Sequence, residues 1–397
     1  MNIVAITPDR ESYFLPLKEH LDFPLKFLSK VDWEEFMELR PIAALILGDW
    51  EYDLTEFIRK CKSNRIPTIL LMDGTIEWKH FFENPKWSFG NNEAPYFPVY
   101  CDKIFVPGES TFRFLEFFGN KGKCEITGFP RLDNYNEVNI QENVKTIRTK
   151  KILGIMSGNT AGYTEEQIKQ SKKLFEDIYF WSKAHLEFEV KWRLRKGFEK
   201  ILDVVIENDD SPSLSDFINK VDAIICQPST ATYEAMLMGI PVALADYGIA
   251  PNYMHAAWEI HSTQQIDKVI RELLNPSNLK LSLQQQILND NIAFCGRSAQ
   301  ICGLIINQMI KIAKGLSATN WIFPERMAIN ALNKLKIENK DIQMCLFPHR
   351  TSYKFTEITL LEEDYAKIKQ QNEQLKYQLS RRSIGFWMDR LIKKITK

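Results

Sequence analysis

Ser229 and Thr230 follow the apolar run Ala223-Ile224-Ile225 and begin a helical run. A strand that enters a helix through such residues places free backbone N–H groups and two hydroxyls at the positive end of the helix dipole. These groups suit a phosphate or a diphosphate, and Glu234, close to one helical turn further on, can reach a ribose. The alternative is that Ser229 or Thr230 does no more than cap the helix.

A second polar loop follows the apolar run 152–156 and precedes a helix that starts near Thr164. Its residues are Ser157, Gly158, Asn159 and Thr160. Gly158 permits the close approach of the backbone to a ligand. The carboxyl end of a strand is also where open α/β sheets bind ligands. We therefore expect a second phosphate-binding loop here, and the alternative is an ordinary turn.

Two arginines, Arg193 and Arg195, alternate with apolar residues at the end of an expected strand. The arginine side chain presents a fork of N–H donors that matches planar anions. We expect these residues to pair with a diphosphate or an acidic sugar. The alternative is that both are solvated charges at a strand end.

Two carboxylates, Asp73 and Glu77, follow the apolar run 68–72, with Trp78 and Phe81 beside them. A carboxylate near apolar aromatic groups can have a raised pKa and act as a general base. Aromatic rings also stack on the faces of sugars. We expect Asp73 and Glu77 to be catalytic and Trp78 to line the same cleft. The alternative is a surface turn in which Asp73 accepts backbone hydrogen bonds.

Four further residues are expected at the cleft. Asp246, Asn252 and His255 follow the strand-like run 241–245, and Arg131 belongs to the run G-F-P-R-L-D that closes the first half of the chain. His255 is a candidate to orient a phosphate or an acidic sugar, although a lone histidine is often structural. The cysteines and histidines show no zinc spacing and the pattern D-x-D is absent, so we expect no bound metal.

The composition limits the class of protein. With 397 residues, the chain exceeds the roughly 250 to 300 residues at which a single core usually divides. Lys+Arg and Asp+Glu balance at 51 each, so the net charge gives no reason to expect nucleic acid as a partner. The scattered cysteines indicate reduced thiols in a cytosolic protein. Without a run of about 18 apolar residues or the apolar segment of a signal peptide, we expect a cytoplasmic chain that does not span a membrane.

Short apolar runs alternate with amphipathic stretches along most of the chain. This alternation is typical of βαβ units around a parallel sheet. We expect an α/β fold with one Rossmann-like domain over residues 1–135, which contains Asp73, and a second over residues 150–315, which contains the two phosphate-binding loops. A polar bridge joins them.

The C-terminal part has a different character. We expect a connecting helical segment over residues 316–350 and an amphipathic or weakly coiled helix over residues 355–380 that pairs with its own copy in a homodimer. Residues 381–397 place apolar side chains along one helical side and are rich in Lys and Arg. This stretch fits a helix on an anionic membrane surface. The alternatives are a helix docked on the protein's own core and a solvated tail.

The order S/T-x-x-x-E-A-x-x-x-G-x-P-V, from Thr230 to Val242, resembles the nucleotide-binding segment of GT-B glycosyltransferases. The resemblance implies two Rossmann-like domains that face a cleft, metal-independent chemistry, and a nucleotide-sugar donor as substrate with no other cofactor. The sequence departs from the fuller pattern of two glutamates separated by seven residues, because Cys226 stands at the earlier position. One expected contact to the donor sugar is therefore missing.

Two further motifs, D-G-x-x-E-W and G-x-P-R-L-D, resemble bacterial glycosyltransferases that build surface polysaccharides. The second motif is also similar to CDP-glycerol glycerophosphotransferases, and the same broad group includes β-Kdo transferases, which use CMP-Kdo. The resemblance covers roughly residues 65–260. It implies transfer of a sugar, with CMP-Kdo as one candidate donor, to a lipid-linked or polysaccharide acceptor in lipopolysaccharide or capsule biosynthesis. Such an acceptor would place the enzyme peripherally at the inner membrane.

Three other functions stay open on the sequence. A CDP-glycerol-type glycerophosphotransferase would use the same phosphate sites. A sugar-nucleotide epimerase would convert the donor with no acceptor present. A non-catalytic assembly subunit would bind nucleotide weakly or not at all.

Overall fold

The computed structural model describes residues 1–7, 10–48, 52–76, 95–96, 98–135, 150–160, 163–248, 254–294, 296–317, 319–328, 369–371 and 373–374. The chain divides into two compact units, Met1–Glu338 and Asn339–Lys397. Both sheets and all the helices named here lie in the first unit. The expected helices over 355–380 and 381–397 fall outside the described residues, apart from five positions near 371.

The first sheet has six parallel strands in the order β2-β1-β3-β4-β5-β6. The strands are β1 (Asn2–Ile6), β2 (Leu25–Leu28), β3 (Pro41–Ile46), β4 (Thr68–Leu71), β5 (Lys103–Val106) and β6 (Cys124–Ile126). The α-helices along this part of the chain are α1 (Trp33–Glu38), α2 (Tyr52–Ser63) and α4 (Glu109–Leu115). Five of the six strands lie on the short apolar runs that alternate with amphipathic stretches along the sequence, and β2 was not predicted.

The second sheet has five parallel strands in the order β11-β10-β9-β7-β8. The strands are β7 (Ile152–Met156), β8 (Glu189–Arg193), β9 (Ala223–Cys226), β10 (Val242–Ala245) and β11 (Trp258–Ile260). Its helices are α6 (Glu165–Ala184), α7 (Leu214–Ile218), α8 (Thr230–Leu237), α9 (Ile266–Leu274) and α10 (Asn278–Asn291). The prediction of two parallel-sheet, Rossmann-like domains is confirmed, although β11 was not predicted.

Short helical turns complete the described elements. Five are 3-10 helices: η1 (Glu11–Tyr13), η2 (Leu15–His20), η4 (Pro130–Leu132), η5 (Phe198–Ile201) and η6 (Thr263–Gln265). One π-helical turn, η3 (Glu116–Asn120), extends α4. Helix α6 begins near Thr164, as predicted, with a capping box: the Thr164 side chain accepts from the N–H of Gln167, and the Gln167 side chain accepts from the N–H of Thr164.

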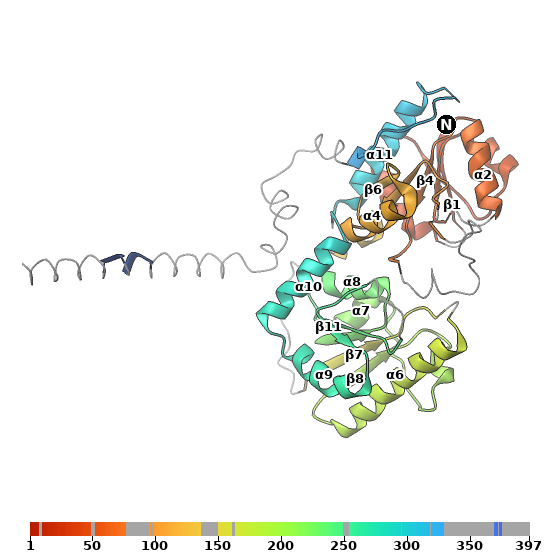
Figure 1. The fold of residues 1–397 in the computed structure, drawn as a ribbon. Coiled ribbons are helices and arrows are strands. Elements are labelled where there is room, and N and C mark those ends of the chain that lie inside the picture. Colours follow the sequence, from red (N-terminus) through yellow and green to blue (C-terminus); the bar gives the residue numbers. More distant parts are fainter. Residues whose placement is uncertain are drawn as a thin grey trace, which may run out of the picture. The chain divides into compact units, whose positions relative to one another are not determined.

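Alternate residues of a strand point to opposite faces of its sheet, and in both sheets helices cover these two faces. In the first sheet, Val4 packs in one core with Phe57 of α2, and Ile3 packs in another with Ile305 of α11 (Ser298–Ala313). Figure 1 shows α2 and α11 on opposite sides of this sheet. The second sheet has α6 and α9 on one face and α7, α8 and α10 on the other.

Helix α11 returns the chain to the first sheet. The predicted second domain extended to residue 315, but the apolar side of α11, with Ile301, Ile305 and Met309, packs in the core that contains Ile3 and Ala43. The spacing of these three residues at i, i+4 and i+8 forms one helical stripe, and only its neighbours in space decide which sheet it covers. Residues 298–313 therefore belong with the first domain.

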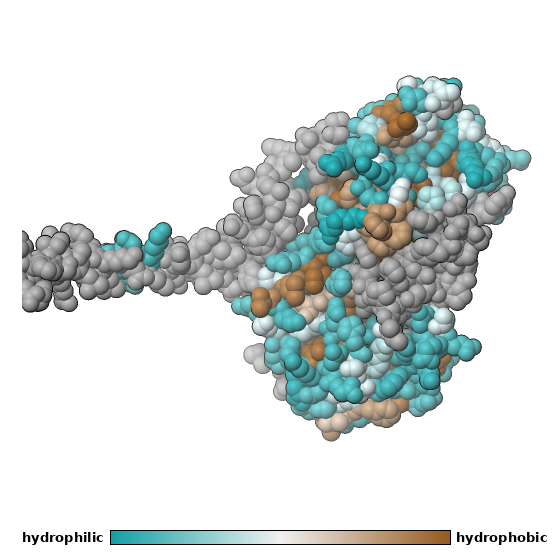
Figure 2. All heavy atoms as spheres, in the orientation of Figure 1, coloured by the Kyte–Doolittle hydropathy of each residue, from teal (hydrophilic) through white to brown (hydrophobic). Residues whose placement is uncertain are grey.

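The described surface is largely hydrophilic in the view of Figure 2. Apolar side chains show over α10, where Leu279 and Leu283 are exposed. No helix within the described ranges has the length and the apolar character that crossing a membrane requires.

Candidate active site

The two predicted phosphate-binding loops lie side by side, because they follow the neighbouring strands β7 and β9 at the carboxyl edge of the second sheet. The backbone N–H of Gly158 donates to the side-chain oxygen of Gln227 at 3.1 Å. A Cβ atom on Gly158 would lie 2.9 Å from the carbonyl oxygen of Pro228, so only glycine fits without movement. Gln227 is buried and donates in turn to Ser171 of α6, which fixes the pair of loops to the domain.

The end of β8 joins the same edge. The hydroxyl of Ser157 accepts a hydrogen bond from the backbone N–H of Arg195 at 2.7 Å, while the Arg195 side chain is exposed. Arg193 is directed elsewhere, since its guanidinium donates to the carbonyl of Ser211 at 2.9 Å and packs on the ring of Phe217. Of the two predicted arginines, only Arg195 is adjacent to the predicted phosphate-binding loops through these contacts.

The remaining residues of the first loop lead into α6. Asn159 and Thr160 follow Gly158, and the carbonyl of Thr160 accepts from the N–H of Tyr163 at 3.1 Å. This turn precedes the capped N-terminus of α6 at Thr164. The loop 157–160 thus connects a strand end to a helix start, as its sequence predicts.

Ser229 occupies the N-cap position of α8 but does not cap it with its side chain. Its hydroxyl lies 3.4 Å from the sulfur of Cys226 instead. The first N–H groups of α8 therefore have no side-chain acceptor from the cap residue. Free N–H groups at a helix start can, together with the helix dipole, bind an anion.

The segment after β4 contacts the start of α8. The backbone N–H of Thr75 donates to the hydroxyl of Thr230 at 3.2 Å, and a Cβ atom on Gly74 would lie 2.9 Å from the same oxygen. The Thr75 hydroxyl donates to the sulfur of Met254. Because the Thr230 oxygen accepts from Thr75, its own O–H can still donate to a phosphate oxygen.

Asp73 forms an ion pair with Arg10, which follows β1. Both side chains are partly exposed, so the pair borders solvent. Arg10 was not predicted as a site residue, because no motif links it to a segment 63 residues away. Two other predicted residues near Asp73, Glu77 and Trp78, lie outside the described residues.

Glu234 is nearly enclosed, with 9% of its side chain exposed. One carboxylate oxygen accepts from the guanidinium of Arg131 at 2.7 Å, and the other accepts from the hydroxyl of Tyr135, also at 2.7 Å. Burial opposes the charge on Arg131, but the carboxylate of Glu234 outweighs this effect and raises the pKa of Arg131. Burial and the same negative charge raise the pKa of Tyr135, which keeps its hydroxyl a donor.

The run G-F-P-R-L-D also holds the returning helix. The carboxylate of Asp133 accepts from the N–H groups of Ser298 and Ala299, at 2.9 and 2.7 Å, at the start of α11. Burial raises the pKa of Asp133 in spite of these bonds, which lower it. Through this motif, Arg131 contacts Glu234 of α8 and Asp133 contacts the start of α11.

The other predicted cleft residues follow β10. Asp246 is buried and accepts from the N–H of Gly248. His255 is exposed and lies 3.7 Å from Glu259, and Asn252 is outside the described residues. His261 was not predicted. It follows β11, contacts the carbonyl of Asp246 at 3.1 Å and pairs with Glu259 at 2.9 Å.

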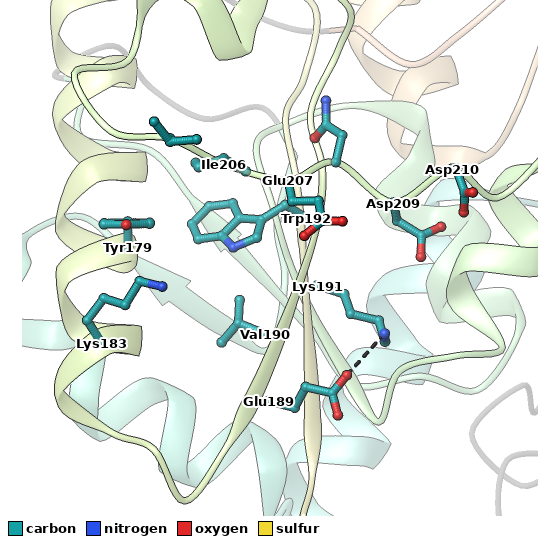
Figure 3. A pocket seen from close by; sticks show the side chains of 12 residues that line it. Tyr179, Lys183, Glu189, Val190, Lys191, Trp192, Ile206, Glu207, Asp209 and Asp210 are labelled. Carbon is teal, nitrogen blue, oxygen red and sulfur yellow. Dashed lines mark ion pairs between the residues drawn. The ribbon is translucent and has the colours of Figure 1, made fainter.

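A separate cavity of about 700 Å³ lies between α6, β8 and residues 205–210. Figure 3 shows Tyr179 and Trp192 in its wall and the ion pair between Glu189 and Lys191, whose atoms are 3.0 Å apart. None of the predicted site residues lines it. Within the described residues, no cluster of three or more metal-ligating side chains occurs.

Two parallel sheets with helices on both faces, arranged as two Rossmann-like domains, define a GT-B type of fold. The chain is similar to S. aureus MnaA in complex with UDP, with a TM-score of 0.57, 15% identity, and coverage of 79% of this chain and 97% of that chain. The UDP-GlcNAc 2-epimerase of Neisseria meningitidis bound to UDP-GlcNAc gives a TM-score of 0.54, 15% identity, and coverage of 78% and 100%. The wall teichoic acid polymerase TagF gives a TM-score of 0.51 and 13% identity, with coverage of 79% of this chain and 90% of that chain.

No protein-family profile matches the sequence, and no curated protein matches it. At identities of 13 to 15%, the structural likeness establishes the fold and not the activity.

Proposed function

We propose that the chain is a GT-B-type glycosyltransferase that binds a nucleotide sugar at the carboxyl edge of its second sheet and transfers the sugar to an acceptor. One observation carries the proposal. The uncapped start of α8, the loop 157–160 and the segment 73–75 of the first domain meet around Thr230 and Pro228.

Each group has a role that follows from its chemistry. The N–H groups at the start of α8, with the hydroxyls of Ser229 and Thr230, would bind the diphosphate, and Gly158 would let the backbone approach it. Arg195 would supply a mobile positive charge at the rim. Asp73 would act on the acceptor or the reacting carbon as a base or a nucleophile. Its present partner, Arg10, would then orient the carboxylate.

The similar structures favour a second candidate, an epimerase acting on a nucleotide sugar. The N. meningitidis enzyme is covered over its full length, and S. aureus MnaA over 97% of its chain. An epimerase would use the same nucleotide site but would need no acceptor. The likeness to the polymerase TagF favours a third candidate, a transferase of the glycerophosphotransferase kind, which the same assays would detect.

The finer parts of the proposal concern the donor, the acceptor and the place of action. CMP-Kdo is one donor to test, and a lipid-linked or polysaccharide acceptor of lipopolysaccharide or capsule assembly would suit a chain held at the inner membrane by its basic stretch 381–397. Residues 355–380 would join two copies. Sedimentation with anionic vesicles, for the full chain and for a chain ending at residue 380, tests the membrane contact. Light scattering, for the full chain and for a chain ending at residue 354, tests the dimer.

The experiment that tests the function is a thermal-shift screen against CMP, CDP, UDP, GDP and dTDP, because a ligand that binds the native state raises its stability. Ser229→Ala and Gly158→Ala should remove the shift. The positive nucleotide then selects the sugar nucleotide for product analysis with and without acceptor. Turnover that requires an acceptor supports the transferase, and conversion without one supports the epimerase. If none of the five nucleotides shifts the unfolding temperature, the nucleotide site is refuted.

A further inference from the structure

The cavity beside β8 is separate from the proposed nucleotide site, and its lining suits a carbohydrate. We propose that it binds a stretch of an uncharged oligosaccharide. The inference goes beyond the proposed function, because such binding requires no nucleotide and uses none of the residues assigned to the nucleotide or to catalysis. Only the purpose of the binding, a second contact with the glycan during transfer, rests on the proposed function.

The cavity exists because the segment 205–210 covers only part of the sheet edge. β8 is an edge strand, and the segment pairs with it at Trp192, opposite Asn208. The N–H of Asp209 donates to the carbonyl of Trp192 at 2.7 Å, and the Asn208 side chain accepts from the N–H of Leu194 at 2.9 Å. Beside this attachment, about 700 Å³ stays open between the segment, β8 and α6 (Figure 3). This volume lies within the range of small-ligand pockets, roughly 300 to 1,000 Å³.

The strand edge also offers backbone groups to a ligand. The N–H of Glu189 donates to the carbonyl of Lys151, on the side of β7. Successive residues of a parallel strand direct their backbone groups to opposite sides. The N–H and C=O groups of Val190, which lines the cavity, are therefore directed toward the open edge.

The charges of the lining favour hydroxyl groups over an ion of either sign. Two of the four carboxylates are paired with lysines, Glu189 with Lys191 at 3.0 Å and Asp209 with Lys220 at 3.2 Å. The other charged residues of the lining are Lys183, Glu207 and Asp210. An anion would meet carboxylates here, and a cation would meet an ammonium group. A sugar hydroxyl can donate to a carboxylate and accept from an ammonium group in the same cavity.

Aromatic rings form the wall between α6 and β8. The ring centroids of Tyr179 and Trp192 are 6.5 Å apart, with the planes inclined by 45°. The Nζ atom of Lys183 lies 5.0 Å from the centroid of the Tyr179 ring, which places a donor at the same wall (Figure 3). Val205, which is 92% exposed, adds apolar surface to the lining. Such a wall can pack against the C–H face of a sugar ring while the polar groups bond its hydroxyls.

The cavity lies close to the proposed nucleotide site. Trp192 is three residues before Arg195, whose N–H donates to Ser157 of the loop 157–160. Three residues span at most about 11 Å. A glycan whose reacting end lies at the nucleotide site can therefore extend into the cavity.

The test is calorimetric titration of the full chain with three neutral probes, maltotetraose, cellotetraose and chitotetraose. At least one probe should bind wild type, and more tightly than its monosaccharide does. Tyr179→Ala and Glu207→Gln should each weaken this binding about tenfold, because the first removes a ring of the wall and the second a charged acceptor for a hydroxyl. The thermal shift caused by nucleotide should be the same in both variants as in wild type.

Phe117→Ala and Glu187→Gln are the matched controls. Phe117 is an aromatic residue of η3 that is 85% exposed, and Glu187 is an exposed carboxylate that pairs with Arg271. Neither residue lines the cavity, so both variants should keep the wild-type affinity for the probe. If Tyr179→Ala does not fold, Glu207→Gln still tests the site, since Glu207 is exposed.

The outcomes separate this inference from the proposed function. It is overturned if no probe binds wild type, or if Tyr179→Ala and Glu207→Gln bind the probe as wild type does. Loss of the nucleotide shift in both variants would also overturn it, because the cavity would then not be a separate site. Probe binding that depends on Tyr179 and Glu207, in a chain that no nucleotide stabilises, would uphold the carbohydrate site and refute the nucleotide site.

Discussion

The backbone N–H of Thr75 donates to the hydroxyl of Thr230 across a distance of 3.2 Å. Thr75 follows a strand of the first sheet, and Thr230 begins a helix of the second. One hydrogen bond therefore connects the segment that carries Asp73 with the proposed phosphate site. The Thr230 hydroxyl can therefore contact the Asp73 segment and a bound phosphate at the same time.

Replacement of this hydroxyl should affect stability and nucleotide binding together. In Thr230→Val, the Thr75 N–H loses its acceptor, which costs about 1 kcal/mol of unfolding free energy. Nucleotide affinity should fall about tenfold, because the O–H donor to phosphate is also lost. Denaturant unfolding and calorimetric titration measure the two effects, and Thr230→Ser should retain most of both.

Ser213→Ala provides the comparison for this variant. Ser213 caps α7 in the same domain, with its hydroxyl accepting from the N–H of Asp216. Its loss should cost about 1 kcal/mol of stability and leave nucleotide affinity unchanged. If both variants bind nucleotide as wild type does, Thr230 has no part in the site.

Gly158→Ala tests the contact between the two loops. The new Cβ atom would lie 2.9 Å from the carbonyl oxygen of Pro228, which is backbone and cannot rotate away. We expect a loss of about 1 to 3 kcal/mol in unfolding free energy, as for overpacked interiors, and weaker nucleotide binding because the loops separate. Gly315→Ala, whose Cβ would meet its nearest atom at 3.6 Å, should change neither property. Unchanged binding in Gly158→Ala would show that the loop spacing is irrelevant to the ligand.

The sequence predicts the strands that are buried on both faces. β7, β9 and β10 are continuous apolar runs whose every residue is buried, and such runs can hardly be anything but interior strands. β2 could not be predicted in this way, because it is a short edge strand and its residue Lys26 is exposed. β11 is an edge strand of three residues, too short for a periodic signal.

Whether the contacts of a site residue could be predicted depends on how far apart the contacting residues lie in the sequence. Ser157, Gly158 and Ser229 lie together because parallel strands bring their carboxyl ends to one edge, which the alternation of strands and helices predicts. The sheet order, in which β7 lies between β8 and β9, does not follow from the sequence. The partners of Glu234 could not be predicted, since Arg131 is 103 residues away and meets it only through the packing of the two domains. Arg10 and Gln227 were missed because their partners, Asp73 and Gly158, lie 63 and 69 residues away and are reached only through the fold of each residue's own domain.

Asp73 is the carboxylate that we propose to act in catalysis, and Asp73→Asn tests this role. We expect the turnover of the nucleotide sugar identified by the screen to fall by a factor of about 100 or more, since the amide cannot accept a proton or attack carbon. The dissociation constant of the nucleotide alone should not change. Glu56→Gln removes an exposed carboxylate of α2 that pairs with Arg59, and it should keep full turnover. Substantial turnover in Asp73→Asn would mean that another residue is catalytic.

His261 should make stability depend on pH above 6.5. Burial lowers the pKa of its imidazole, but the hydrogen bonds to Glu259 and to the carbonyl of Asp246 outweigh burial and raise it above the ordinary 6.5. The folded state thus favours the protonated ring. Its contribution is fully present below pH 6.5 and is lost as the pH rises through the folded pKa.

The difference in unfolding free energy between wild type and His261→Gln should therefore be largest near pH 5.5 and shrink at higher pH. Glu259→Gln should flatten the same dependence, because Glu259 supplies the charge that pairs with His261 at 2.9 Å. His20→Gln is the comparison, since His20 forms none of the ion pairs found within the described ranges. A difference that grows with pH would mean that the folded state prefers neutral His261.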